Sequence, residues 1–364
     1  MSLYQPRGEC PTLSQPMATG DGLLLRLTPI APLDKSAWAV LADFAAQHGN
    51  GLLDLTLRGG IQVRGLSAQG AALAPEILPA AGFAEQSPVL ATDPLGLDDP
   101  HAWGDSHALA ASVATHLPGL PPGLPAKVTL ALDAAGRLDD LAADLRLRWV
   151  AKDRVRLAVG PSWVAEDTAD HIAALTLDWL RRLAKAGSRA AALAPSPTLP
   201  APPPGTALPL GPVTGSIALA APAFGALTVA ELRAVLALPG LVRLRPAAGR
   251  RLALWFAEAL PSQWPDFLAL DGNDPRLGIS ACIGAPGCAA ALQATRTLAQ
   301  TLAATDAALG PLHLSGCVKA CGAPRDGTAH AAATPTGWAI TNDHDGRLRA
   351  ALALRGEKAD GLCV

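Results

Sequence analysis

The sequence predicts an α+β fold that contains one structural unit twice. The order strand, helix, strand occurs in residues 22–66 and returns in residues 215–256, which indicates a degenerate internal repeat. A proline-rich stretch separates the two copies, and four cysteines gather in two loops near the carboxyl end. With 364 residues, half of them apolar, the chain is long enough to form two or more domains.

The first copy predicts a helix followed by a half-buried strand. Asp34 is a good N-cap for the helix. In "LDLTLRGGIQVRG", apolar and polar residues alternate until glycines interrupt the pattern, as expected of a strand with one buried face. The expected buried side chains are Leu53, Leu55 and Leu57, and the expected exposed ones are Asp54, Thr56 and Arg58. In the second copy the helix starts at Thr228, and strands rich in arginine follow it.

The segments outside the repeat predict further α/β structure. Residues 126–160 read as a series of strands and turns, and residues 167–187 as a helix that ends at Gly187. Residues 288–310 predict an alanine-rich amphipathic helix, and "PLHLSG" a short strand. Each cysteine pair therefore lies in a loop at the boundary of an element.

No charged residue occurs between Ala190 and Ala230, which raises the question of a membrane span. The stretch "APSPTLPAPPPGTALPLGP" is too rich in proline for an uninterrupted helix, so we expect a semi-rigid extended linker. The net charge of −2 gives no basic field to attract nucleic acid or an anionic membrane. The amino-terminal segment lacks the pattern of a secretory signal, and we expect a cytoplasmic protein.

The two cysteine pairs predict a metal centre, because disulfides are rare in a reducing cytoplasm. Cys317 and Cys321 have a spacing that suits zinc, whereas Cys282 and Cys288, with five residues between them, do not. A cubic iron–sulfur cluster needs four converging thiolates, and the glycine-rich loops "CIGAPGC" and "GCVKACG" suit it. The spacing favours the cluster over structural zinc or unligated thiols. Cys10 and Cys363 stand outside this set.

The cysteine spacing resembles the cluster signature of the sulfite and nitrite reductase superfamily. "LTLRGGIQV" resembles the Thr-x-Arg-x-x-x-Gln strand of that superfamily, which implies that Thr56, Arg58 and Gln62 face a tetrapyrrole. Lys127 in "LPAKVTLALD" resembles the lysine of its "LP-x-K-F" strand, although Val128 replaces the usual aromatic residue. The resemblance implies two ferredoxin-like half domains in a pseudo-twofold repeat, and cluster-binding α/β domains.

Domain boundaries follow from this resemblance and from the linker. We expect a first ferredoxin-like half domain at 20–90, an α/β domain at 91–194 and the linker at 195–212. A second ferredoxin-like half domain is expected at 213–270, and an iron–sulfur cluster domain at 271–364.

One branch of the superfamily fits best. "RGECPTLSQPMATGDGLLLRLTP", "LPAKVTLALD", "ADLRL" and "SGCVKACGAP" resemble the precorrin-3B synthase family. The resemblance implies an oxygen-dependent monooxygenase of aerobic cobalamin biosynthesis, which hydroxylates precorrin-3A at the meso carbon between rings A and D, with lactone formation. It implies a 4Fe-4S cluster, a mononuclear non-haem iron, dioxygen and electrons from NADH. Because no nucleotide-binding fingerprint is present, we expect the electrons through a separate reductase or ferredoxin.

A precorrin carries many carboxylates, so its site should present fixed cations. We expect Arg26, Arg58, Gln62, Arg64 and Lys127 to bind it, helped by Arg243 and Arg245 of the second copy. Lys319, inside the last cysteine loop, could raise the cluster potential or bind a carboxylate. The alternative for each of these cations is a solvated charge at a strand edge or in a loop.

Two histidine-containing segments leave alternatives open. His101, Asp105 and His107 are the residue types of an iron site with two histidines and one carboxylate, but Asp105 also suits the cap of a helix that begins near Ser106. The cap is the favoured interpretation. His313 alternates with leucines beside the cysteine loop, and we expect a packed, hydrogen-bonded histidine there.

Two other functions compete with the monooxygenase. A sirohaem-dependent sulfite or nitrite reductase would use the same four cysteines, although the short chain argues against it. A zinc-stapled binding protein without enzymatic activity would explain the cysteines but not the strands rich in arginine.

Overall fold

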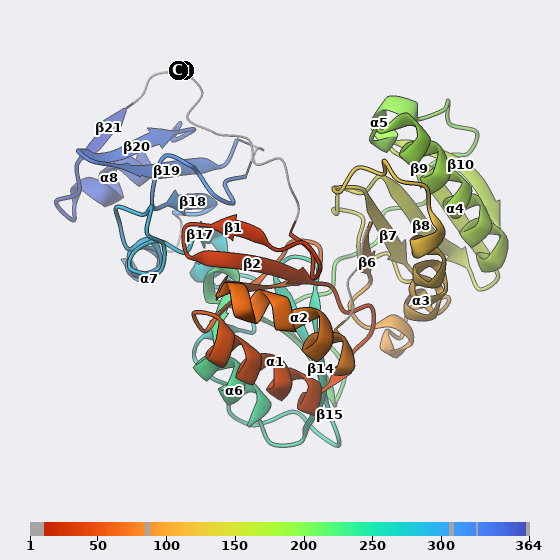
Figure 1. Cartoon of the computed structure of the whole chain (residues 1–364), viewed down its shortest axis with the longest axis horizontal. Helices are drawn as coiled ribbons and strands as arrows, with labels where there is room; N and C mark the ends of the chain where they lie inside the picture. Colours follow the sequence, from red (N-terminus) through yellow and green to blue (C-terminus); the bar gives the residue numbers. More distant parts are fainter. Residues whose placement is uncertain (1–10, 84–87, 306–308, 325–326, 362–364) are drawn as a thin grey trace.

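The described residues form four β-sheets, which lie in three parts of the molecule (Figure 1). The computed structural model describes residues 11–83, 88–305, 309–324 and 327–361, so Cys10 and Cys363 lie outside the described residues. Two sheets and their helices form a central body. A third sheet forms what we call the α/β lobe, and the fourth forms the cysteine lobe, named for the loops that leave its strands.

The first sheet of the central body has the strand order β1-β2-β5-β4-β13, and all its neighbours are antiparallel. Its strands are β1 (Met17–Thr19), β2 (Gly22–Leu27), β5 (Ile61–Leu66), β4 (Leu52–Leu55) and β13 (Ala226–Thr228). The helices of this copy are α1 (Lys35–His48) and α2 (Ala68–Ala80). Asp34 occupies the predicted N-cap of α1, but its side chain makes no capping hydrogen bond.

The second sheet repeats this order as β11-β12-β15-β14-β3, with β16 paired to β12. Its strands are β11 (Gly211–Pro212), β12 (Ile217–Pro222), β15 (Arg251–Phe256), β14 (Leu241–Ala247), β3 (Leu33–Asp34) and β16 (Leu268–Ala269). Helix α6 (Val229–Leu236) begins after Thr228, as predicted. Thr228 and Glu231 form a capping box, in which each side chain accepts the backbone N–H of the other residue.

The two copies exchange one strand each, and this exchange joins them. Strand β13 of the second copy extends the first sheet, where Ala226 faces Asp54, while β3 of the first copy extends the second sheet, where Leu33 faces Leu244. Helices α1 and α6 pack together, and buried side chains from both copies form one core. The predicted pseudo-twofold repeat is thus confirmed, and its two halves share a single hydrophobic core.

The α/β lobe contains a mixed sheet with the order β10-β9-β8-β7-β6. Its strands are β6 (Val89–Thr92), β7 (Thr129–Asp133), β8 (Leu145–Ala151), β9 (Arg154–Val159) and β10 (Ser162–Asp167). Its helices are α3 (Ser106–His116), α4 (Ala169–Ala186) and α5 (Ala190–Leu193). Helix α4 ends at Gly187, whose φ of +59° lies in the left-handed region that glycine tolerates, as predicted.

The cysteine lobe contains the sheet β17-β18-β19-β20-β21. Its strands are β17 (Ile279–Ala281), β18 (Leu312–Ser315), β19 (Ala329–Thr334), β20 (Gly337–Thr341) and β21 (Ala359–Gly361), and its helices are α7 (Thr295–Thr305) and α8 (Arg347–Ala353). Short 3₁₀ turns elsewhere are η1 (Gly96–Asp98), η2 (Leu117–Gly119), η3 (Ala223–Gly225) and η4 (Pro275–Gly278).

The prediction of a helix over residues 288–310 is partly wrong. Helix α7 starts only at Thr295, and residues 306–308 lie outside the described residues. The preceding backbone is engaged elsewhere, because Ala289 N–H donates to the carbonyl of Gly20 at 2.9 Å and Leu292 N–H to that of Gly316 at 2.6 Å. These tertiary hydrogen bonds override the helical propensity of the alanines.

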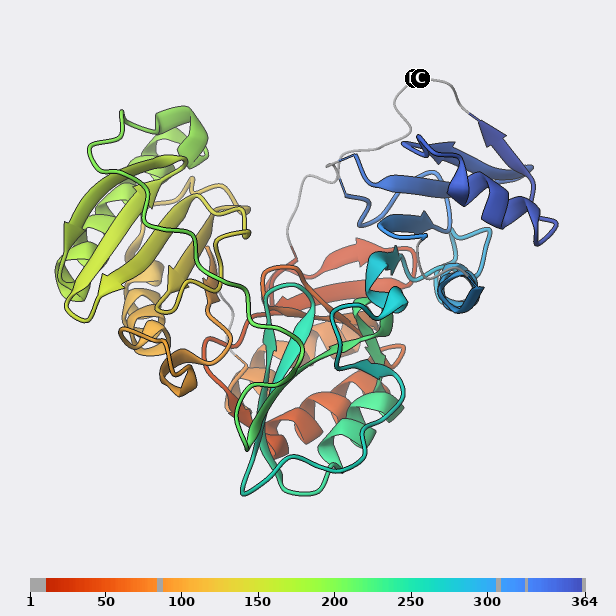
Figure 2. The ribbon, with the colours of Figure 1, turned by 180° about the vertical axis from the view of Figure 1, so that it is seen from behind.

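The proline-rich linker runs from the α/β lobe to the central body as an extended strap (Figure 2). Proline carbonyls in an extended segment remain free acceptors, and arginines of the folded parts use them. Arg156 donates to the carbonyl of Pro200 at 3.0 Å and Arg148 to that of Pro203 at 3.3 Å. Arg137 donates in the same way to the carbonyl of Thr206 at 2.6 Å. The linker is therefore fixed along its length. The domain boundaries expected from the sequence stay a prediction.

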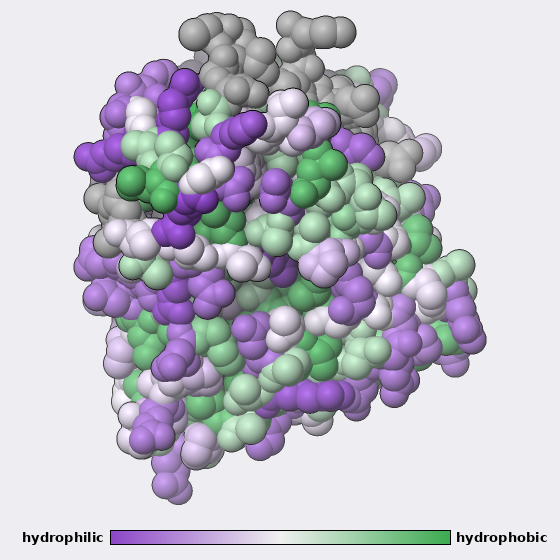
Figure 3. Space-filling model, turned by 90° about the vertical axis from the view of Figure 1, so that its left-hand side faces the viewer, coloured by the Kyte–Doolittle hydropathy of each residue, from purple (hydrophilic) through white to green (hydrophobic). Residues whose placement is uncertain are grey.

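Figure 3 shows hydrophilic and hydrophobic residues interspersed over the face at the left of Figure 1. Within the part of the chain that the structure describes, no helix combines the length and apolar character needed to cross a bilayer.

Trp38 provides a test of the shared core. Its indole N–H donates to the carbonyl of Leu244 at 3.0 Å, so it links helix α1 of the first copy to β14 of the second in a fully buried position. We expect Trp38→Phe to lower the free energy of unfolding by about 2 kcal/mol, because a buried carbonyl loses its donor. Urea denaturation followed by circular dichroism measures this.

The matched control is Trp103→Phe, since the Trp103 side chain is 51% exposed. This variant should change the free energy of unfolding by less than about 0.5 kcal/mol. Equal effects of the two substitutions would show that the hydrogen bond from Trp38 to Leu244 does not contribute measurably to the free energy of unfolding.

Candidate functional site

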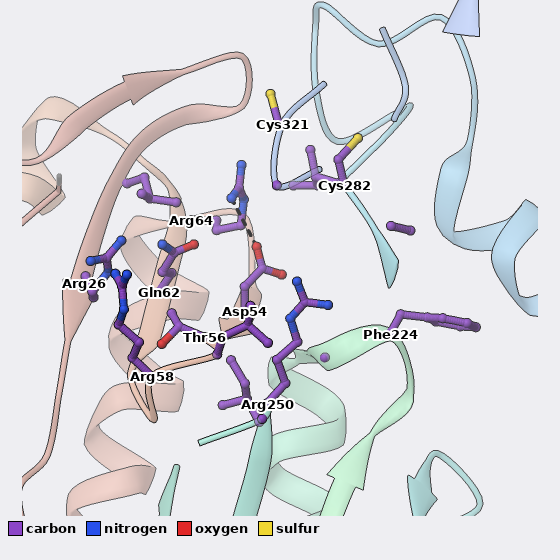
Figure 4. A pocket seen from close by; sticks show the side chains of 18 of the residues that line it. Arg26, Asp54, Thr56, Arg58, Gln62, Arg64, Phe224, Arg250, Cys282 and Cys321 are labelled. Atoms are coloured by element: carbon purple, nitrogen blue, oxygen red, sulfur yellow. Dashed lines mark hydrogen bonds and ion pairs between the residues drawn. The ribbon is translucent and has the colours of Figure 1, made fainter. Parts of the chain in front are cut away.

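A cavity of about 960 Å³ lies where the central body, the α/β lobe and the cysteine lobe meet. Part of it is shown in Figure 4. The central body contributes a row of polar side chains and arginines, and the cysteine lobe contributes sulfur atoms. The α/β lobe contributes the loop that follows β7. A site formed by residues so distant in sequence requires all three parts in place.

Strand register places the predicted polar residues on one face. Arg26 on β2 is paired with Gln62 on β5, and Gln62 is paired with Asp54 on β4, so the three side chains form a row across the first sheet. Alternation sends their neighbours to the opposite face, which is buried in the core. The Nε of Arg26 is buried without a hydrogen-bond partner in the described structure. The sheet thus presents cations and an amide to the cavity.

Arg64 lies on the same face but is already bound to carboxylates. Its guanidinium makes two hydrogen bonds with Asp21, at 2.8 and 2.9 Å, and an ion pair with Asp54 at 3.1 Å. Arg296 of α7 donates to the other oxygen of Asp54 at 2.6 Å. Burial acts to raise the pKa of Asp21, but the hydrogen bonds and charge of Arg64 outweigh it, and the pKa is lowered. Arg64 therefore holds the cavity wall together.

Arg250 is a cavity residue that the sequence analysis did not single out. The two hairpin turns of the repeat meet here. The backbone of Arg58 forms an isolated antiparallel β-bridge with that of Ala248, and Gly249 N–H donates to the carbonyl of Leu57 at 3.0 Å. Arg58 and Arg250 thus come to one place from the two copies (Figure 4). A signal existed in the sequence, because both lie next to glycine in the hairpin turns of a repeat.

The backbone holds Arg250 in a conformation that needs support. Its φ of +61° is uncommon for a residue with a side chain, and a Cβ at Gly225 would overlap its Cδ. Its guanidinium makes no hydrogen bond or ion pair with the residues that the structure describes. Burial lowers the pKa of Arg250, and the charge of Asp54 opposes this. Such an arginine is suited to an anionic ligand group.

All four predicted cysteines line this cavity, each partly buried and none in a disulfide. Gly316 N–H donates to the Sγ of Cys282 at 3.1 Å, a bond that stabilises a thiolate. A Cβ at Gly20, in the turn after β1, would overlap the Sγ of Cys288. In the described chain no three His, Cys, Asp or Glu side chains are close enough to hold one metal ion. The four thiols thus line one cavity, but they are not close enough together to bind a single metal ion.

The donor set fits the cluster that the resemblance implies. Four thiols face a common cavity, a backbone N–H points at one sulfur, and a glycine leaves room beside another. These are features that iron–sulfur centres use for ligation and for tuning their potential.

Other predicted cations lie elsewhere. Lys127 and Lys319 are exposed and do not line the cavity within the described residues, and Arg243 is exposed above the Trp255 ring. Arg245, expected to help bind the ligand, is instead fully buried and donates to the Oγ1 of Thr92 at 2.7 Å and to the Nε2 of His107 at 2.5 Å. Its strand β14 faces the α/β lobe here, so this expectation is corrected: Arg245 joins two parts of the molecule.

The iron site considered at His101, Asp105 and His107 is not formed. Asp105 caps α3 by accepting from Ala108 N–H at 2.9 Å, His101 is exposed, and His107 points to Arg245. His313 is buried, as expected, and bonds to Ser280 and to the carbonyl of Cys321 at 2.8 and 3.1 Å. Burial, helped by His330, lowers the pKa of His313 to about 3. A neutral His313 thus supports the last cysteine loop.

Comparison with known proteins connects this geometry to a family. The chain is 30% identical over 389 residues to a protein named precorrin-3B synthase from Sinorhizobium sp., a match that spans 92% of this chain and 82% of the relative. The chain belongs to the precorrin-3B synthase family. It is therefore an oxidoreductase.

A solved structure agrees in fold. The NirA protein of Mycobacterium tuberculosis superposes with a TM-score of 0.61 at 17% identity, covering 83% of this chain and 69% of NirA. No family model matches the chain.

For this precorrin-3B synthase family member, His107 predicts a pH dependence of stability. Burial and the charge of Arg245 lower the pKa of His107 to about 4. Between that value and the usual 6.5 of histidine, the unfolded chain binds a proton that the folded chain does not, so stability falls as the pH is lowered. We expect a loss on the order of 2 kcal/mol from this residue between pH 6.5 and 5.

Urea denaturation of the wild type and of His107→Gln at pH 7 and pH 5 measures this contribution. The variant is expected to be less stable at pH 7 but to lose less stability on acidification. An identical pH response of both proteins would contradict the assignment.

Proposed function

We propose that the chain converts precorrin-3A to precorrin-3B in aerobic cobalamin biosynthesis. One atom of dioxygen enters the ring as a hydroxyl group at the meso carbon between rings A and D, and the ring A acetate forms a lactone. The other atom leaves as water, with two electrons that originate from NADH. The observation that carries the proposal is a single large cavity bounded by arginines from both copies of the repeat and by four cysteines, in a chain of this family.

Size and charge support a tetrapyrrole ligand. The cavity volume of about 960 Å³ is near the upper end of the range for small-molecule and cofactor sites, which is about 300–1,000 Å³. Arg26, Arg58 and Arg250 present guanidinium groups to it, and Gln62 adds an amide. Several fixed cations suit a ring with carboxylates around its edge. Arg64 positions this wall through Asp21 and Asp54.

The proposed 4Fe-4S cluster would be held by Cys282, Cys288, Cys317 and Cys321. When bound, it supplies electrons one at a time to the cavity. The residues of this chain hold the ring at a fixed orientation, so that one meso carbon is presented for attack. The mononuclear iron that the resemblance implies would need ligands other than His101, Asp105 and His107, because Asp105 caps α3 and His107 accepts from Arg245. We propose that a separate reductase or ferredoxin delivers the electrons, and that the protein works in the cytoplasm.

Metal analysis tests the proposal. Protein purified without oxygen should contain about four irons and four sulfides per chain, with an absorption shoulder typical of such clusters and no extractable sirohaem. It should then consume precorrin-3A only when dioxygen and reducing equivalents are both present. Stoichiometric sirohaem would instead favour a reductase, and zinc without sulfide would exclude both enzymes.

Gly20→Ala tests the cluster ligands without removing one. A methyl group at Gly20 would overlap the Sγ of Cys288, so we expect less than half of the wild-type iron and sulfide per chain. The matched control is Gly215→Ala, because a Cβ at Gly215 meets no atom within 4 Å. Full cluster content in both variants would show that Cys288 does not need its present position.

A further inference from the structure

The loop that joins β7 to β8 carries Asp140, whose environment differs from that of the nearby aspartates. Asp133, Asp139 and Asp144, in and beside this loop, all make hydrogen bonds or ion pairs that stabilise the fold. Asp133 accepts two backbone N–H groups, Asp139 accepts the backbone N–H of Gly205 and pairs with Arg148, and Asp144 pairs with Arg189. Asp140 is exposed, lines the cavity and makes no hydrogen bond or ion pair within the described structure.

The backbone around Asp140 is held firmly. Arg146 donates to the carbonyls of Leu138 at 2.6 Å, Leu141 at 2.7 Å and Asp139 at 3.3 Å. The charge of Asp140 also acts on the Arg146 guanidinium, whose donors nevertheless go to the backbone. A fixed backbone reduces the entropy that a ligand contact must overcome. Asp140 is thus presented to the cavity by a preorganised loop.

The side chains beside Asp140 identify the ligand group that it suits. Leu138, Leu141 and Ala142 of the same loop also line the cavity. Arg137 of this loop lines it too, but its donors go to Asp99 and to the carbonyl of Thr206, so the loop offers Asp140 among mostly apolar side chains. The carboxylates at the edge of a tetrapyrrole would be repelled by Asp140 and attracted to the arginines of the central body. The inner pyrrole N–H groups lie in the middle of the apolar ring, where their only partners are the imine nitrogens of the ring itself. A carboxylate on an apolar surface complements that arrangement.

We propose that Asp140 accepts hydrogen bonds from the inner N–H groups of a metal-free tetrapyrrole, and so makes the cavity select the metal-free ring over its metal complexes. This inference rests on the proposed function, since it assumes a tetrapyrrole in the cavity. A metal in the ring replaces the inner protons. Asp140 would then face the ring without donors, and binding would be weaker.

Binding of uroporphyrin III and of its copper(II) complex tests the inference. Both carry the same edge carboxylates, and copper in a square-planar site leaves no inner N–H. We expect Asp140→Asn and Asp140→Ala to weaken binding of the metal-free ring about tenfold, as for loss of a hydrogen bond to a charged group. Binding of the copper complex should stay within about twofold or become tighter. Tryptophan fluorescence quenching of the full chain gives both dissociation constants.

The matched control is Asp153→Asn, an exposed acid in the turn between β8 and β9 of the same lobe, which should change neither constant. Equal losses for both rings in the Asp140 variants, or no loss for the metal-free ring, would overturn the inference and leave the proposed function standing. If the wild type bound neither ring, the tetrapyrrole cavity and this inference would both fail. Unchanged thermal unfolding of the variants would confirm that they fold.

Discussion

The exchange of strands between the two copies of the repeat is the constraint on which the rest of the molecule depends. Because β3 completes the sheet of the second copy and β13 that of the first, neither half has a complete sheet alone. The exchange fixes the two hairpin turns against each other, so that Arg58 and Arg250 enter one cavity. It also merges the two apolar faces into one core, which leaves the polar faces of the strands free to form a binding surface.

Opposite charges keep this surface open. An array of arginines around a cavity would repel one another, and Asp21 and Asp54 neutralise part of that charge by binding Arg64 and Arg296. Arg64 and Arg296 stabilise the wall between the central body and the cysteine lobe. Arg250, held in place by its backbone and by the space at Gly225, keeps its donors for a ligand. Structural and ligand-binding arginines are thus distinguished by their partners.

The cysteine loops depend on the same body. The turn at Gly20 accepts a hydrogen bond from Ala289 and leaves space beside Cys288, while Arg296 binds Asp54. The α/β lobe closes the opposite side, and it is attached through Arg245, through the indole of Trp255 bound to Asp98 at 2.8 Å, and through the linker. The shape of the cavity therefore depends on the relative positions of the central body, the α/β lobe and the cysteine lobe. A shift of any one of them would change that shape.

The sequence by itself determined the α+β class, the repeat and the candidate thiols, because these are recorded in local patterns: alternation in strands, caps such as Thr228, and cysteines at fixed spacing in glycine-rich loops. It also placed Arg26, Gln62 and Arg64 on cavity-facing strands, since alternation decides which face a side chain takes. Thr56 and Arg58 reach the cavity from the turn after β4, where alternation ends and Leu57 is 59% exposed instead of buried as expected. Only the tertiary structure decided which cations reach the cavity. Arg245 and Arg250 look alike in sequence, yet one is buried against the α/β lobe and the other faces the cavity, because strand pairing and lobe packing bring together residues that no local pattern connects.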